Sequence, residues 1–133
     1  MRARILVIED DPASLELVIY LLGRAGYDAI PAANGLDGSR RALSALADLV
    51  LCDLQLPLLN GYEVLSSIRN DVRAQNLCVI ALTAFSMPGD REKALEAGFN
   101  GYMSKPIDPE TFVRDVESYL APDFRVRHVT DAG

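Results

Sequence analysis

Continuous apolar runs, each followed by a segment with helical periodicity, constrain the fold of this chain more than any other feature. Five runs are predicted strands, at residues 5–8, 28–33, 49–52, 77–82 and 101–103. Apolar runs without alternation are typical of parallel strands that are buried on both faces of a sheet. Each segment between two runs has room for a single helix, which predicts right-handed crossovers and a doubly wound α/β sheet.

The number of strands narrows the topology. With five parallel strands and five helices, we expect a flavodoxin-like fold with the strand order 2-1-3-4-5. Half of the 133 residues are apolar and no second block of pattern follows the fifth helix, so we expect one domain over residues 1–121. Residues 122–133 show no periodicity and are predicted to form a flexible tail.

Capping residues mark two of the predicted helix starts. Asp11 before Pro12 is typical of an N-cap followed by the first helical residue. Asn60 and Glu63 have the spacing of a capping box. The second predicted helix lacks such a signal, so its prediction depends on its apolar stripe alone. That stripe is formed by Leu36, Ser39, Leu43 and Leu46.

The last two predicted helices are less regular. Pro88 opens the fourth helix and Gly98 closes it, but its apolar stripe is weak. Because this helix would bury few apolar contacts, shifting or locally loosening it would cost little free energy, and we expect a movable face there. Asp108 and Pro109 predict the start of the fifth helix.

Composition argues against several classes of function. The formal net charge is −6 and the basic residues are dispersed, which argues against direct nucleic-acid binding. No apolar stretch approaches the about 20 residues of a membrane span, and the first strand follows without a signal peptide, so we expect a soluble cytoplasmic protein with no membrane contact. Cys52 and Cys78 lie within apolar runs and are predicted to be small buried hydrophobes rather than a disulfide or metal pair.

Polar residues stand at the ends of four of the five predicted strands. They are Glu9 and Asp10, Asp53, Thr83, and Lys105. Because the carboxyl ends of parallel strands meet at one edge of the sheet, we expect these groups to share one crevice. Taken singly, each is more often a cap, an ordinary strand residue or a surface charge. Their joint position at strand ends predicts a site.

These residue types suit phosphoryl transfer to a carboxylate. Three carboxylates in one crevice repel each other, and an all-oxygen set favours a hard cation such as Mg²⁺ over zinc. Asp53 stands alone at the end of the most central strand and is predicted to be the nucleophile, which would give an acyl phosphate. Lys105 would balance the charge of the incoming oxygens, and the Thr83 hydroxyl would donate to one of them.

Four segments resemble the receiver domain of two-component response regulators. They are residues 5–11 (ILVIEDD), 51–57 (LCDLQLP), 82–84 (LTA) and 102–106 (YMSKP). The resemblance covers residues 3–121 with the order and spacing of the family. Within this CheY-like superfamily, residues 83–90 (TAFSMPGD) resemble stand-alone, single-domain regulators of the cell-cycle type and receivers of hybrid kinases more than transcription factors, and the chain as a whole looks most like the stand-alone regulators.

The resemblance implies a signalling switch rather than an enzyme, because receivers catalyse only their own phosphorylation and dephosphorylation. It implies that a histidine kinase or a histidine phosphotransfer protein phosphorylates Asp53. It also implies that Mg²⁺ is bound by Glu9, Asp10, Asp53 and the backbone carbonyl of Gln55. Glu9 replaces the commoner aspartate, and its longer side chain is expected to favour ligation through a bridging water.

The resemblance further implies a switch pair, Thr83 and Tyr102. Their movement would alter the face built by the fourth helix, fifth strand and fifth helix for a downstream protein target. A cis bond before Pro106 and a monomer or weak phosphorylation-dependent dimer are also implied. Because residues 122–133 are too few to fold as an output domain, we expect output by protein contact, phosphate relay or a domain outside this chain.

Other classes of protein fit the residues less well. A haloacid-dehalogenase-type phosphatase has a second acid two residues after its nucleophile, where this chain has Gln55. A flavin-binding electron carrier needs a phosphate loop after the first strand, where Glu9 and its acidic neighbours would repel phosphate. A histidine phosphotransfer protein needs a structured histidine, but the only one is His128 in the predicted tail. A pseudo-receiver that is never phosphorylated is the remaining alternative, although such modules typically lose pocket residues that this chain keeps.

Overall fold

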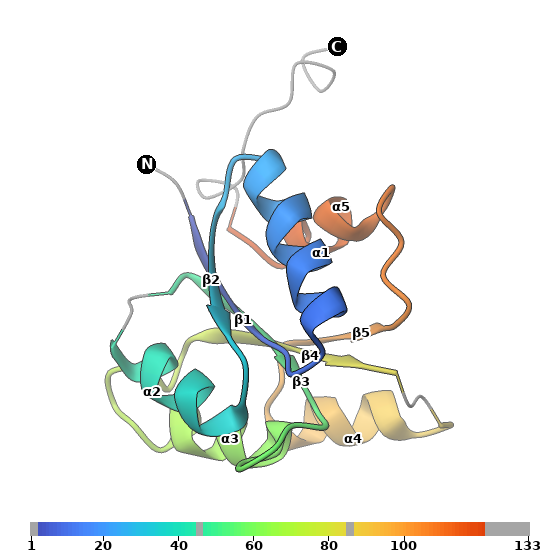
Figure 1. Ribbon diagram of the computed structural model, residues 1–133. Coiled ribbons are helices and arrows are strands. Elements are labelled where there is room, and N and C mark those ends of the chain that lie inside the picture. The colour runs from blue at the N-terminus through green and yellow to red at the C-terminus, as the bar shows by residue number, and fades with distance from the viewer. Residues whose placement is uncertain (1–2, 45–46, 85–86, 122–133) are drawn as a thin grey trace.

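A computed structural model describes residues 3–44, 47–84 and 87–121. Within them, five strands alternate with five helices (Figure 1). The elements are β1 (Arg4–Ile8), α1 (Pro12–Arg24), β2 (Asp28–Ala32), α2 (Gly35–Ser44), β3 (Leu49–Asp53), α3 (Gly61–Arg69), β4 (Cys78–Thr83), α4 (Asp90–Ala97), β5 (Gly101–Ser104) and α5 (Phe112–Glu117). The predicted tail, which includes His128, lies outside the described residues.

One parallel sheet contains these strands in the order β2-β1-β3-β4-β5, which confirms the predicted topology. Every residue of β3 is buried, as expected for an apolar run at the centre of a sheet with both faces covered. Because β1, β3, β4 and β5 are neighbours, their carboxyl ends form one continuous edge.

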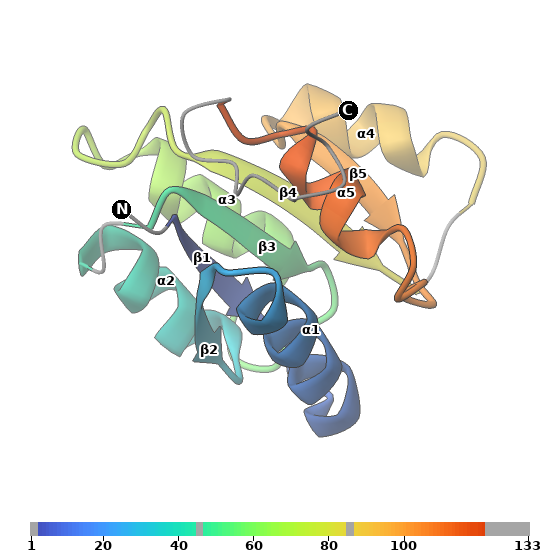
Figure 2. The same ribbon diagram turned by 90° about the horizontal axis from the view of Figure 1, so that it is seen from above.

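Alternate residues of the central strands face different helices. In β1, Ile5 and Val7 share a core with α1 and α5, whereas Leu6 and Ile8 share a second core with α2, α3 and α4. Figures 1 and 2 show these two sets of helices on opposite sides of the sheet. The chain therefore forms three layers, with helices on both faces.

Both predicted capping signals are confirmed. The Ser14 amide donates to Asp11 Oδ2 at 3.1 Å at the start of α1. At the start of α3, the Glu63 amide donates to Asn60 Oδ1 at 3.0 Å and the Asn60 amide donates to Glu63 Oε1 at 3.1 Å. These caps fix the loops that follow β1 and β3, which carry predicted site residues.

The predicted apolar stripe of α2 is confirmed in part, because Ser39 is buried and Leu43 packs against the core, whereas Leu36 does not belong to the buried side. The buried residues of α2 are Gly35, Gly38, Ser39 and Ala42, while Leu36 is 38% exposed. A Cβ added at Gly38 would lie 2.6 Å from Ile8 Cδ1, so small residues let α2 approach β1 closely. Leu46, the last residue of the predicted stripe, lies outside the described residues.

The last two helices begin later than predicted. α4 starts at Asp90 instead of Pro88, and α5 starts at Phe112 instead of Asp108. The Asp108 carbonyl accepts hydrogen bonds from the amides of Thr111 and Phe112, so a turn precedes α5. α4 buries only Ala94, in agreement with the expected small number of buried contacts.

Two further expectations concern the cysteines and the membrane. Cys52 is buried and Cys78 is half-buried, and both are free thiols, as predicted. In the part of the chain that the structure describes, no helix has the length and apolar character needed to cross a membrane.

Candidate functional site

The carboxyl ends of β1, β3, β4 and β5 bring the predicted site residues to one edge of the sheet. Asp53 and Thr83 are the last residues of β3 and β4, and Glu9 and Lys105 directly follow β1 and β5. Glu9, Asp53 and Thr83 are buried, whereas Asp10 is exposed. Groups from four separate parts of the sequence thus line one crevice.

Lys105 forms the central contacts of this crevice. Its Nζ donates to Glu9 Oε1 at 2.9 Å and to Glu9 Oε2 at 2.8 Å, and also to Asp53 Oδ2 at 2.9 Å. One ammonium group therefore compensates two buried carboxylates, which offsets part of their desolvation. The peptide bond between Lys105 and Pro106 is cis, as the family resemblance implies.

Backbone amides orient the same carboxylates. The Gln55 amide donates to Asp53 Oδ1 at 2.9 Å, and the Asp11 amide donates to Glu9 Oε1 at 3.2 Å. Each carboxylate thus accepts hydrogen bonds from a cation and from a backbone amide, and these bonds are stronger when the carboxylate is ionised. Asp53 presents one oxygen to Lys105 and the other to the loop after β3.

The charge state of Glu9 depends on its burial and on its neighbours. Burial raises the pKa of Glu9 to about 7; Asp53 acts in the same direction, and the Lys105 ammonium acts against it. Burial alone would lower the pKa of Lys105, but its hydrogen bonds to Asp53 and Glu9 reverse the effect and raise it. The site therefore keeps its lysine protonated and carries more negative charge than this one cation offsets.

Three acids of the site form a cluster that can hold a cation. One carboxylate oxygen each from Glu9, Asp10 and Asp53 lies within 4.8 Å of the others. Because this cluster offers only oxygen ligands, its chemistry fits Mg²⁺ better than a soft metal. The backbone amide of Gln55 donates a hydrogen bond to Asp53, whereas binding of Mg²⁺ by the backbone carbonyl of Gln55 stays a prediction.

Thr83 and Tyr102, the predicted switch pair, lie on neighbouring strands. Ala81 pairs with Tyr102 and Thr83 pairs with Ser104, so the side chains of Thr83 and Tyr102 point to the same face of the sheet. Both residues are buried. The Lys105 amide donates to the Thr83 carbonyl at 2.9 Å, which links the end of β4 to the lysine of the site.

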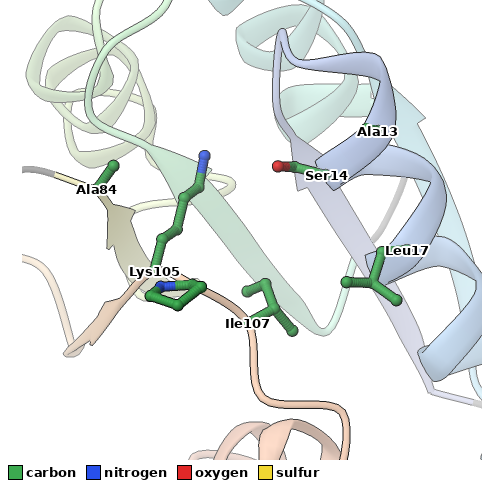
Figure 3. A pocket seen from close by; sticks show the side chains of 7 residues that line it. Ala13, Ser14, Leu17, Ala84, Lys105 and Ile107 are labelled. Atoms are coloured by element: carbon green, nitrogen blue, oxygen red, sulfur yellow. The ribbon is translucent and has the colours of Figure 1, made fainter.

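Two hollows open beside the crevice. A largely apolar one of about 520 Å³ lies between Lys105 and the first turns of α1 (Figure 3). Its lining residues are Ala13, Ser14, Leu17, Ala84, Lys105, Pro106 and Ile107. The other, of about 580 Å³, runs from Asp10 and Thr83 past the loop after β3 to Tyr62 and Lys93; we call it the acceptor groove.

Sequence reasoning missed two contacts of α3 with α4. Arg69 donates to the carbonyl of Gly98 just after α4, and Lys93 lies over the ring of Tyr62. The position of Arg69 at the end of a helix, where free carbonyls gather, was the one available signal for the first contact. The second contact had none, because nothing in the sequence pairs Tyr62 with Lys93.

Comparisons with known proteins agree with this geometry. A family model described as the response regulator receiver domain matches residues 5–117. The polar-differentiation response regulator DivK of Brucella anthropi is 36% identical over 120 residues, which cover 90% of this chain and 98% of DivK.

Solved structures add two similar chains. The chemotaxis response regulator CheY4 of Vibrio cholerae has a TM-score of 0.84 at 25% identity, with 90% of this chain and all of that chain covered. The receiver domain of the sensor histidine kinase PA1611 from Pseudomonas aeruginosa has a TM-score of 0.81 at 33% identity, with 90% and 98% covered. That structure has a magnesium ion coordinated in the active-site cleft.

Proposed function

The chain belongs to the response regulator receiver domain family, and on this premise we propose that it is a Mg²⁺-dependent phosphoryl acceptor of two-component signalling. The acceptor is Asp53. The observation that carries the proposal is the setting of this carboxylate, which is buried at the end of β3, hydrogen-bonded by Lys105 and clustered with Glu9 and Asp10.

In the proposed reaction, an Asp53 oxygen attacks the phosphorus of a phosphohistidine or of acetyl phosphate. A P–O bond forms, and the bond from phosphorus to the donor nitrogen or oxygen breaks with its electron pair leaving on the donor, so that an acyl phosphate results. Lys105 balances charge on the phosphoryl oxygens, and the Thr83 hydroxyl donates to one of them.

The acidic cluster would hold the metal ion. Glu9, Asp10, Asp53 and the Gln55 carbonyl are the proposed ligands, and the magnesium in the similar cleft of the PA1611 receiver domain supports this choice. Bound Mg²⁺ would neutralise charge shared between the acids and the phosphoryl oxygens.

The proposed output is a change of the face formed by α4, β5 and α5. Thr83 would move toward the phosphoryl group and Tyr102 would follow, because both side chains occupy the same face of the β4–β5 pair. Because α4 buries only Ala94, a rearrangement of this helix would cost little free energy. Phosphorylation can shift this equilibrium only by the difference in contacts between the two states.

The proposed partners are a histidine kinase or a histidine phosphotransfer protein and a downstream protein target. The apolar hollow between Lys105 and α1 leaves room for the phosphoryl donor beside the lysine that contacts Asp53 (Figure 3). We propose a single-domain mode of action over residues 1–121, supported by the nearly complete coverage of DivK. The proposal retains the expected monomer or weak phosphorylation-dependent dimer, the cytoplasmic location, and the absence of nucleic-acid or membrane binding.

Intact-mass spectrometry after incubation with acetyl phosphate and Mg²⁺ tests the proposal. We expect the mass of one added phosphoryl group in the unmodified chain and none in Asp53→Asn or in the presence of EDTA. Asp37→Asn, which changes an exposed acid paired with Arg41, is the matched control and should be phosphorylated normally. Phosphoryl mass that persists in Asp53→Asn would overturn the assignment of the acceptor.

A further inference from the structure

Helix α3 holds helix α4 at two places that differ in strength. At the end of α4, Arg69 Nε and Nη2 donate to the Gly98 carbonyl at 3.2 and 2.8 Å, and Nη2 also donates to Asn100 Oδ1 at 2.7 Å. Nη1 of the same guanidinium donates to the carbonyls of Gln75 and Leu77. A charged group with this many fixed hydrogen bonds anchors the end of α4 firmly.

The second attachment depends on a single contact. Lys93 Nζ lies 5.4 Å from the ring centroid of Tyr62, near the start of α3. The Tyr62 ring packs edge-on against Phe99, with centroids 5.6 Å apart. Among the described residues, Lys93 forms no ion pair with a carboxylate. An exposed cation–π contact of this kind is weak and costs little free energy to break.

Among the described residues, the start of α4 has one further side-chain hydrogen bond, from the Met87 amide to Asp90 Oδ2 at 2.7 Å, which joins it to the preceding turn and not to α3. Gly89 precedes the helix with a φ of +92°, and no side chain caps the first turn at this position. Ala94 is the only buried residue of α4. Loss of the Lys93 contact would therefore free the first turns of the helix while the Arg69 anchor remains.

This weak contact lies on the wall of the acceptor groove. Tyr62 and Lys93 line the same groove as Asp10 and Thr83. Tyr62 also packs against the core cluster that contains Tyr102. A change at the phosphorylation site can therefore reach the Lys93 contact through the packing of Tyr102.

We propose that Lys93 and Tyr62 form a latch, which holds the start of α4 against α3 until Asp53 is phosphorylated. The latch rests on the proposed function, because the proposed movement of Tyr102 changes the core cluster against which the Tyr62 ring packs and so withdraws the ring from the Lys93 ammonium. Opening the latch releases the first turns of α4 and uncovers the ring of Tyr62. Lys93 is thus a positioning residue that acts through α4.

A single tryptophan at position 62 would report on the latch. The chain has no tryptophan, so Tyr62→Trp gives one emission signal, and tryptophan is the best aromatic partner for a cation. We expect beryllofluoride with Mg²⁺, a phosphoryl mimic, to shift this emission. Lys93→Met in the same background should show the shifted emission before the mimic is added, whereas Lys93→Arg should keep the response of the parent.

Loss of the latch should also favour binding of the mimic. A ligand that selects the open state binds at lower concentration when the closed state loses a stabilising contact. For an exposed cation–π contact, the half-saturating concentration of the mimic should fall about two- to fivefold in Lys93→Met, measured by calorimetry with Tyr62 intact. Arg91→Met changes an exposed cation of the same helix and should leave this concentration unaltered.

The outcomes separate the latch from the proposed function. If the unmodified chain does not bind the mimic, the proposed function fails and the latch fails with it. If the unmodified chain binds the mimic and Lys93→Met titrates like Arg91→Met, the latch is rejected and the proposed function stands. If Tyr62→Trp does not fold, the calorimetric comparison of Lys93→Met, Lys93→Arg and Arg91→Met decides the question.

Discussion

The Lys105 ammonium lies 2.9 Å from Asp53 Oδ2, although the two residues are 52 positions apart in the chain. The same ammonium lies 2.8 Å from Glu9 Oε2. Before phosphorylation, Lys105 thus compensates the two buried carboxylates, and after phosphorylation its charge would be available to the phosphoryl oxygens. Folding stability and the proposed chemistry therefore depend on one side chain.

Replacement of Lys105 by methionine should destabilise the metal-free protein. The change leaves the buried carboxylates of Glu9 and Asp53 without their cation, but partial exposure of the lysine and protonation of Glu9 limit the cost. We expect the free energy of unfolding to fall by about 2–3 kcal/mol, below the cost of breaking a fully buried pair. Urea denaturation in EDTA measures it, and Arg41→Met, which breaks an exposed pair with Asp37, should change it by less than about 1 kcal/mol.

Mg²⁺ should stabilise the folded chain through the acidic cluster. A ligand that binds only the folded state adds about 2.7 kcal/mol at a hundredfold excess over its Kd. We expect the midpoint temperature of thermal unfolding to rise when Mg²⁺ is added and to return to its metal-free value when EDTA is added. The shift should disappear in Asp53→Asn and persist in Lys105→Met, because the ammonium is not a ligand. An equal shift in Asp53→Asn would contradict the assignment of the cluster as the metal site.

The sheet and the position of the site could be predicted from sequence for a topological reason. Continuous apolar runs identify buried parallel strands, and parallel strands must end at a common edge. Asp53 and Lys105 therefore had to approach each other once the strand order was known. The caps at Asp11 and Asn60 were predictable because they depend on residues three positions apart.

Contacts between side chains of different elements could not be predicted in this way. Nothing in the sequence indicates that Lys105 bonds to Glu9 as well as to Asp53, because this depends on the width of the crevice. Periodicity also assigned Leu36 to the buried side of α2 and missed Gly35, Gly38 and Ala42 there, since it counts leucines and does not register how closely a helix approaches a strand. The contact between Gly38 and Ile8 is such an approach.

Replacement of Arg69 should loosen the junction of α3, α4 and β5. Methionine keeps most of the apolar stem but leaves the carbonyls of Gly98 and Leu77 and Oδ1 of Asn100 without this donor. We expect a loss of about 2–3 kcal/mol in the free energy of unfolding, because several hydrogen bonds to a charged donor vanish together. Lysine should restore little of it, since an ammonium cannot reproduce the geometry of the guanidinium.

The neighbouring Arg73 provides the control for Arg69. Among the described residues, its side chain pairs only with Asp71, two positions earlier, and that side chain is 71% exposed. Arg73→Met should therefore leave the denaturation midpoint nearly unchanged. A similar loss for both arginines would mean that net charge, and not the Arg69 contacts, governs the effect.

Two glycines in helices should respond to alanine in opposite directions. A Cβ at Gly23 in α1 has no heavy atom within 4 Å, so alanine adds helix propensity without a clash and should raise the free energy of unfolding by up to about 1 kcal/mol. A Cβ at Gly35 would overlap the backbone carbonyl of Leu59, which cannot rotate away as a side chain could. Gly35→Ala should therefore cost about 1–3 kcal/mol through overpacking of α2 against the loop after Asp53. In urea denaturation, we expect the midpoint to rise for Gly23→Ala and to fall for Gly35→Ala, with the same dependence of the free energy on urea concentration. A midpoint that rises for Gly35→Ala would exclude the close contact between α2 and this loop.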